Sequence, residues 1–207
     1  MTKTVTLAAP MTSHARTAAT APPALSDEDR RSLLRIARAA MVEELAGTPA
    51  PALDRDRPAL RTWRAAFVTL TRRDTGALRG CRGEVIARRP LAESVARMAI
   101  ASAIDDPRFP PVTVDELPAI RITINALTPP VPIRPEAIVV GRHGLWLTVG
   151  GQSGLLLPEV PLHYGWDRGR FLVALCRKTG APDDAWRRPD AELRGFEAES
   201  WSEDDPG

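Results

Sequence analysis

Two short turns constrain the fold of this chain more than any other feature, because each joins a pair of segments with strand-like patterning. The first turn is Asp74-Thr75-Gly76 and the second is Gly150-Gly151. A connection this short joins antiparallel neighbours, since a parallel pair needs a crossover of about a dozen residues or more. Each pair is followed by a segment in which apolar residues recur at helical spacing. This order predicts an α+β fold and excludes a doubly wound parallel sheet.

The same patterns predict the individual helices and strands and the bounds of the folded domain. We expect helices over 26–46, 90–104 and 171–180, and strands over 63–72, 77–86, 120–127, 145–149, 154–157 and 196–201. Ser26 followed by Asp29 approximates a capping box, and Gly47 predicts the end of this helix. The order of hairpin and helix occurs twice, which hints at an internal repeat. We predict a disordered tail at 1–25, one domain over 26–203 and a polar tail at 204–207.

Charge and composition exclude several functional classes. The 207 residues carry a net charge of only +2, although residues 1–104 carry a net charge of +7. With no recognisable DNA- or RNA-binding motif, this balance argues against a nucleic-acid partner. No apolar run reaches the roughly 18 residues of a membrane helix, so we expect no membrane partner and a cytoplasmic location. Two cysteines cannot build a disulfide-rich secreted scaffold.

The densest candidate for chemistry is the segment from Leu78 to Gly83, with the sequence LRGCRG. Gly80 and Gly83 on either side of Cys81 allow the backbone to bend and to approach a ligand closely. Arg79 and Arg82 place positive charge nearby, which lowers the pKa of a thiol and favours its thiolate. These features point to a reactive thiol with an anion-binding surround. The alternative is that Cys81 is a small buried strand residue and that the glycines serve a bulge.

Two further side chains are candidates for moving protons. His143 lies in the glycine-flanked turn Gly141-Arg142-His143-Gly144, and Glu159 follows Leu157-Pro158. A histidine there can act as a general base, and Glu159 can face the cysteine segment. The alternatives are an ordinary turn histidine and a helix-start charge. The spacing of the cysteines and histidines matches no compact zinc template, and we find no nucleotide-binding motif, so we assign no metal and no cofactor.

Seven blocks, in this order, resemble the AMMECR-type domain family, also known as protein A of the AmmeMemoRadiSam system. They are LRGCRG, DPRFPPVTVDELP, ITINALTPP, VGRHGLWL, GLLLPEV, GWDRGRFLVALCRKTG and FEAESW. The resemblance implies an α+β fold in which two β/α repeats share one barrel-like antiparallel sheet with flanking helices. It also implies association with a Memo-like protein and a radical SAM protein, while the family's own activity is not established. Arg82 departs from the apolar residue that is common in the family, which favours a ligand-facing segment.

Two functional hypotheses remain open. In the first, the protein is a small-molecule enzyme or enzyme component: Cys81 is the nucleophile or ligand, Arg79 and Arg82 bind a small anionic substrate, and His143 or Glu159 moves protons. In the second, it is a non-catalytic module that docks on the Memo-like or radical SAM protein. Aromatic side chains are favoured at such interfaces, and the second hypothesis uses Trp63, Trp166 and Trp201 as anchors.

Overall fold

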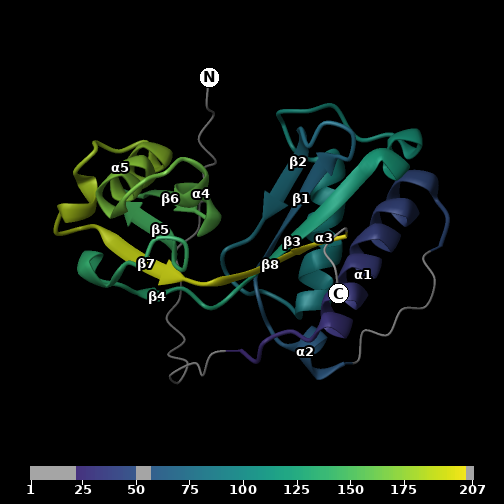
Figure 1. The fold of residues 1–207 in the computed structure, drawn as a ribbon, viewed down its shortest axis with the longest axis horizontal. Coiled ribbons are helices and arrows are strands. Elements are labelled where there is room, and N and C mark those ends of the chain that lie inside the picture. Colours follow the sequence, from purple (N-terminus) through teal and green to yellow (C-terminus); the bar gives the residue numbers. More distant parts are fainter. Residues whose placement is uncertain (1–21, 50–56, 204–207) are drawn as a thin grey trace. The chain divides into compact units, whose positions relative to one another are not determined.

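The computed structural model describes residues 22–49 and 57–203, which form two compact units (Figure 1). The larger unit contains the residues up to 129 and again those from 199, and the smaller unit contains 130–198. The chain therefore leaves the larger unit, builds the smaller one and returns. Most of the predicted N-terminal tail and all of the C-terminal tail lie outside the described residues. Leu25, assigned to the tail from sequence, is buried in the core of the larger unit.

The larger unit is a four-stranded sheet with helices on one face. Its elements are α1 (Asp27–Ala46), α2 (Pro58–Arg61), β1 (Ala66–Arg72), β2 (Leu78–Gly83), α3 (Leu91–Ile104), a 3₁₀ helix (Val114–Ala119), β3 (Ile120–Leu127) and β8 (Ala198–Ser202). The strand order is β2-β1-β3-β8, and β1 pairs antiparallel with both β2 and β3. Val68, Leu70 and Ile122 point into the core beneath α1 and α3. The predicted capping box of α1 forms between Ser26 and Asp29.

The smaller unit has the same kind of layering. Its elements are β4 (Val131–Pro132), a 3₁₀ helix (Pro135–Ala137), β5 (Gly144–Val149), β6 (Gln152–Leu156), α4 (Glu159–His163), α5 (Arg168–Thr179), a 3₁₀ helix (Ala185–Arg187) and β7 (Glu192–Phe196). The strand order is β4-β7-β5-β6 with antiparallel pairing throughout. Leu145, Leu147 and Phe171 lie in its core against α5.

The two units repeat one topology, as the sequence pattern hints. In each, a hairpin is followed by a helix and by a third strand that pairs with the first strand of the hairpin: β1-β2-α3-β3 and β5-β6-α5-β7. In each, a glycine of the second strand packs against the last turn of the helix. A side chain on Gly80 would meet the Ser102 carbonyl, and one on Gly154 would meet Thr179.

The predicted α+β class and its two β/α repeats are confirmed, with two corrections. The strands of the described residues form two open four-stranded sheets, where the family resemblance implied one shared barrel-like sheet. The single strand expected over 196–201 is two strands, β7 and β8, which belong to different sheets. A local pattern of alternation cannot show that the chain changes sheets at Glu197. Within the described residues, no helix is both long and apolar enough to cross a membrane.

Candidate functional site on the open face of the larger sheet

One face of the larger sheet is turned away from α1 and α3 and carries polar side chains. The register pairs Cys81 with Thr69 and Thr69 with Thr123, so these three residues form a row across β2, β1 and β3. Consecutive strand residues point to opposite faces. Because Val68 and Leu70 point into the core, the row points away from it. All three residues are partly exposed. We call Cys81, Thr69 and Thr123 the polar row.

The structure fixes Cys81 through both its side chain and its backbone. The Thr69 hydroxyl donates to the sulfur, with Oγ1 and Sγ 3.2 Å apart. The Cys81 backbone N–H donates to Oδ2 of Asp106 at 2.8 Å. Cys81 is half-buried on an edge strand, so it is not the sealed core residue of the alternative interpretation. The Thr69 hydroxyl can stabilise a negative charge on the sulfur, whereas the Asp106 carboxylate next to the residue opposes one.

Asp106 and Arg108 form an ion pair next to this cysteine. Asp106 is 4% exposed and accepts two hydrogen bonds from the Arg108 guanidinium, at 2.9 and 2.6 Å. Arg108 holds the pKa of this carboxyl well below its usual range. The pKa of Arg108 is raised, mainly by Asp106, and a negative charge on Cys81 adds to that effect. Neither Asp106 nor Arg108 is among the site residues predicted from the sequence. The available signal was an acid two residues before an arginine in a turn.

Arg79 has a structural partner. It is the extra residue of a β-bulge, since Leu70 pairs with Gly80 while Thr71 pairs with Leu78. The bulge directs the guanidinium to Glu116, with contacts of 2.9 and 3.0 Å, and to the carbonyls of two prolines. Arg79 lowers the pKa of Glu116 to about 2. The hydrogen bonds of Arg79 therefore connect β2 with the 3₁₀ helix Val114–Ala119, which comes after α3 in the sequence.

Arg82 and the two glycines of the segment have different surroundings. By strand alternation, Arg82 points to the opposite face from Cys81. Its backbone N–H donates to the Ser102 hydroxyl at 2.9 Å, while its guanidinium has no hydrogen bond or ion pair among the described residues. Gly80 allows β2 to approach α3, and Gly83 lies under the ring of Phe67. The cation coupled to the thiol is thus Arg108, which the sequence did not single out.

Asn125 adds an unsatisfied acceptor to the same face. It pairs with Phe67 in the register of β1 and β3, and it lies two residues along β3 from Thr123. Its side chain is only 2% exposed, and its Oδ1 has no hydrogen-bond partner in the described part of the chain. A buried amide oxygen without a donor is costly, so this position suits a ligand that supplies an N–H or O–H group.

His143 and Glu159 belong to the smaller unit, so the polar row is built without them. Nδ1 of His143 accepts the Val139 backbone N–H at 3.0 Å, which closes the turn before β5 and fixes the ring tautomer. Glu159 begins the five-residue helix α4 and is an exposed residue, although partial desolvation raises its pKa. Within the described residues, no three His, Cys, Asp or Glu side chains are grouped as metal ligands.

Comparison with known proteins places these features in a family. The AMMECR1 family model matches residues 34–201. A protein of Thermococcus kodakarensis is 40% identical over 193 residues, covering 88% of this chain and 94% of its own length. A protein of Methanothermobacter thermautotrophicus is 39% identical, with coverages of 87% and 97%. The crystal structure of an uncharacterized protein from Pyrococcus horikoshii superposes with a TM-score of 0.76 at 41% identity, covering 84% of this chain and 91% of that one.

Proposed function

This chain belongs to the AMMECR1 family, and from its geometry we propose that the polar row is a small-molecule site in which Cys81 is the reactive group. The observation that carries the proposal is the half-exposed thiol, which accepts a hydrogen bond from Thr69 beside the Asp106–Arg108 pair. The protein would act as an enzyme or enzyme component on a small polar substrate. Proton-transfer roles for His143 and Glu159 stay predictions.

The internal repeat supports a site in the larger unit. Aligning the units on Gly80 and Gly154 places Leu155, Trp146 and Arg194 of the smaller unit at the positions of Cys81, Thr69 and Thr123. The smaller unit therefore has a leucine and a tryptophan where the larger unit has a thiol and its hydroxyl donor. Two units with one topology differ in chemistry at this row, so the backbone topology alone does not call for a cysteine and a threonine here.

The surroundings of Cys81 indicate the substrate class. Arg108 is half-exposed beside Asp106, so it can attract a small anion, whereas Arg82 points to the opposite face and can do so only from the edge of the sheet. Asn125 offers an acceptor for a hydroxyl, amine or amide of the ligand. A small anionic molecule with hydrogen-bond donors matches these groups. Arg79, fully engaged with Glu116, takes a positioning role in this proposal.

The rate of alkylation of Cys81 as a function of pH tests the reactive thiol. Iodoacetamide labelling of the full chain, followed by intact mass, should show one addition, with a midpoint below the free-thiol pKa of about 8.5. Cys176 serves as an internal control, because it is buried in α5 and burial raises the pKa of its thiol. Thr69→Val removes the hydroxyl at nearly constant volume and should move the midpoint upward.

Two variants complete this experiment. Cys81→Ser should abolish the labelling, whereas Cys176→Ser should leave the labelling and its midpoint unchanged. A midpoint at or above about 8.5, or no labelling of the folded protein, would remove the reactive-thiol proposal.

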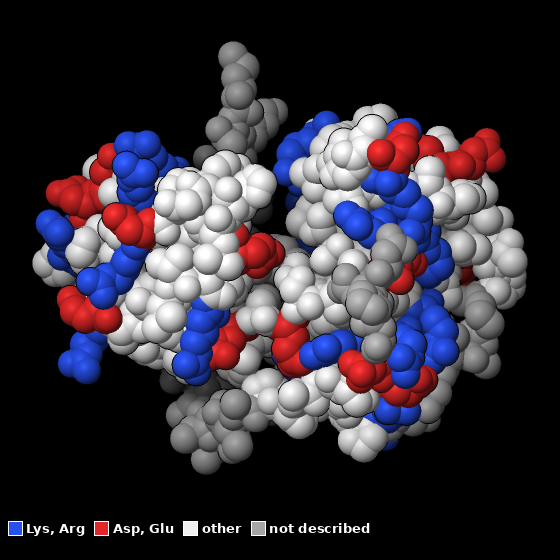
Figure 2. Space-filling model, viewed as in Figure 1, with Lys and Arg blue, Asp and Glu red and all other residues white. Residues whose placement is uncertain are grey.

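A second candidate function, the docking module, is favoured by an exposed apolar surface on the smaller unit. Leu162 and Tyr164 are each 61% exposed, and the Tyr164 ring stacks on Trp166 with centroids 4.8 Å apart. Figure 2 shows an uncharged surface around α4. Trp63 is also exposed, but Trp201 is buried and donates its indole N–H to the Arg30 carbonyl, so it cannot serve as an anchor. The expected partners are the Memo-like and radical SAM proteins.

A pull-down with the purified Memo-like and radical SAM proteins of the same host tests this alternative. Binding at low salt that is weakened by Tyr164→Ala, but not by Trp63→Ala in the larger unit, would support docking through α4. If the pull-down recovers neither the Memo-like nor the radical SAM protein, the docking hypothesis is wrong for these two partners.

A further inference from the structure

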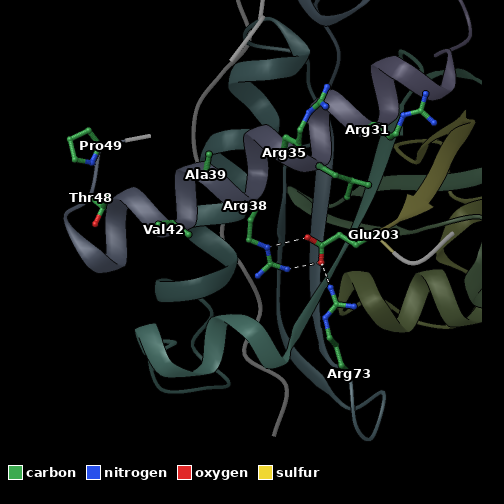
Figure 3. A pocket seen from close by; sticks show the side chains of 10 residues that line it. Arg31, Arg35, Arg38, Ala39, Val42, Thr48, Pro49, Arg73 and Glu203 are labelled. Atoms are coloured by element: carbon green, nitrogen blue, oxygen red, sulfur yellow. Dashed lines mark hydrogen bonds and ion pairs between the residues drawn. The ribbon is translucent and has the colours of Figure 1, made fainter. Parts of the chain in front are cut away.

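A pocket of about 640 Å³ opens over α1 in the larger unit (Figure 3), and no residue of the polar row is among the described residues that line it. This volume falls within the range of about 300–1,000 Å³ in which proteins hold small ligands or side chains of a partner. Its lining combines cations with apolar side chains: Arg31, Leu34, Arg35, Arg38, Ala39, Val42, Thr48, Pro49, Arg73 and Glu203. Neither the proposed thiol chemistry nor the α4 surface uses this pocket.

Two of the four arginines already hold a carboxylate of the chain. Glu203 accepts hydrogen bonds from Arg38 at 3.0 and 2.6 Å and from Arg73 at 2.8 Å, which Figure 3 shows as a clamp between α1 and the β1–β2 turn. The backbone N–H of Ile122 donates to the same carboxylate at 3.1 Å. This arrangement shows how the pocket recognises a carboxylate. It also means that Arg38 and Arg73 are not available to a second one.

The other two arginines, Arg31 and Arg35, are the more exposed ones. Arg31 and Arg35 share a single carboxylate, Glu28, at 3.2 and 2.9 Å, and their side chains are 55% and 57% exposed. Two exposed guanidinium groups of the pocket therefore share one carboxylate of the described residues. In Figure 2, positively charged side chains gather over α1 on the face shown. Because exposed ion pairs of this kind contribute little to stability, Arg31 and Arg35 can exchange Glu28 for an incoming acid at low cost.

The apolar part of the lining narrows the choice of ligand. Leu34 and Val42 lie on α1 one helical turn before and after Arg38, and Ala39 and Pro49 also line the pocket. A phosphate or a nucleic-acid backbone has no group that gains from covering these side chains, whereas a peptide with acidic and leucine-like residues matches both parts of the pocket. We infer that this pocket is a docking site for an acidic peptide segment of a partner protein, with Arg31 and Arg35 as its charged contacts.

Fluorescence anisotropy tests this inference on the full chain. The probe is a fluorescein-labelled peptide of alternating glutamate and leucine residues, compared with a polyglutamate peptide of equal length. The leucine-containing peptide should bind at least about tenfold more tightly, and its affinity should fall when the salt concentration rises from about 50 to 300 mM. Arg31→Gln combined with Arg35→Gln should weaken binding by about tenfold or more.

A matched control distinguishes this site from general charge attraction. Arg177 is an exposed arginine of α5, 69% exposed and paired with Asp183, so Arg177→Gln should leave the affinity unchanged. Val42→Asp should weaken binding of the leucine-containing peptide more than that of polyglutamate. Thermal unfolding checks that each variant is folded.

Three outcomes would overturn the inference: equal affinity for both peptides, no effect of the double glutamine variant, or displacement by an oligonucleotide or inorganic phosphate as efficient as by the unlabelled peptide. Because Cys81 takes no part, the alkylation profile is independent of every one of these results.

Discussion

At the scale of single residues, hydrogen-bonding partners decide whether an arginine near the candidate site serves the fold or a ligand. The sequence places Arg79 and Arg82 on either side of Cys81, and proximity along the chain suggests that both act on the thiol. In the structure, a bulge turns Arg79 to Glu116, and strand alternation turns Arg82 to the opposite face. Arg108, from a loop that follows α3, is the cation coupled to Cys81.

The Arg79–Glu116 pair should make the protein less stable in acid. The pKa of Glu116 is about 2 in the folded protein against an ordinary value of 4.5, so its contribution is complete above about pH 4.5 and is lost as pH falls toward 2. Glu116→Gln should lower the free energy of unfolding at pH 7 by on the order of 1 kcal/mol, because solvent around the partly exposed Glu116 side chain screens the pair. Urea unfolding at pH 7 and pH 3 measures this difference, which should shrink at the lower pH.

Asp115→Asn is the neighbouring control, because no hydrogen bond or ion pair of the Asp115 side chain is present among the described residues. It should change the free energy of unfolding by less than about 0.5 kcal/mol. A Glu116→Gln deficit of the same size at both pH values would show that the pair does not account for acid sensitivity.

At the scale of elements, each repeat depends on close packing between the second strand of its hairpin and the last turn of its helix. Gly80 brings β2 against the Ser102 carbonyl, and Gly154 brings β6 against Thr179. The same approach allows the Ser102 hydroxyl to donate to the Val68 carbonyl and to accept the Arg82 N–H. Gly80, which directly precedes Cys81, is therefore explained by the packing of β2 against α3. The same packing fixes the position of Cys81 in the polar row.

Gly80→Ala should destabilise the protein by about 1–3 kcal/mol. The added Cβ would overlap the Ser102 carbonyl oxygen, which belongs to the backbone and cannot rotate away as a side chain can. Gly169→Ala in the first turn of α5 is the matched control, since its Cβ would meet only Asp167 at an ordinary 3.5 Å. Thermal unfolding should show a lower Tm for the first variant and an unchanged or higher Tm for the second. Equal Tm values for both would contradict the close-approach explanation.

The sequence predicted most elements because their signals are local. Ser26 and Asp29 cap α1, Asp74-Thr75-Gly76 turns the first hairpin, and both β/α repeats follow from periodicity. It did not predict which strands share a sheet, since pairing between β3 and β8 joins residues about 75 positions apart, and alternation is the same in either sheet. For the same reason, the sequence identified Cys81 but not Asp106, whose contact with it depends on the path of the chain after α3.

At the scale of the whole molecule, the larger unit is closed by a strand that arrives after the smaller unit is complete. β8 brings Glu199 to Arg64, whose side chain is 1% exposed, at 2.8 Å. Arg64 also donates to the carbonyls of Ala126 and Leu127 at the end of β3. Glu199 additionally accepts the backbone N–H of Leu25, just before α1. The Glu199 carboxylate thus links three segments that are distant in sequence: the start of α1, the segment before β1, and β8.

Loss of this carboxylate should therefore loosen the larger unit and leave the smaller one intact. Glu199→Gln leaves the Arg64 guanidinium buried without its counter-charge, at a cost of up to about 3 kcal/mol, below that of a fully buried pair because Glu199 is 25% exposed. Hydrogen exchange should show weaker protection of β3 and the start of α1, with unchanged protection of β5 and β7. Asp183→Asn, which breaks the exposed pair with Arg177, should change neither. Equal loss of protection in both units would show that Glu199 supports the whole chain and not the larger unit alone.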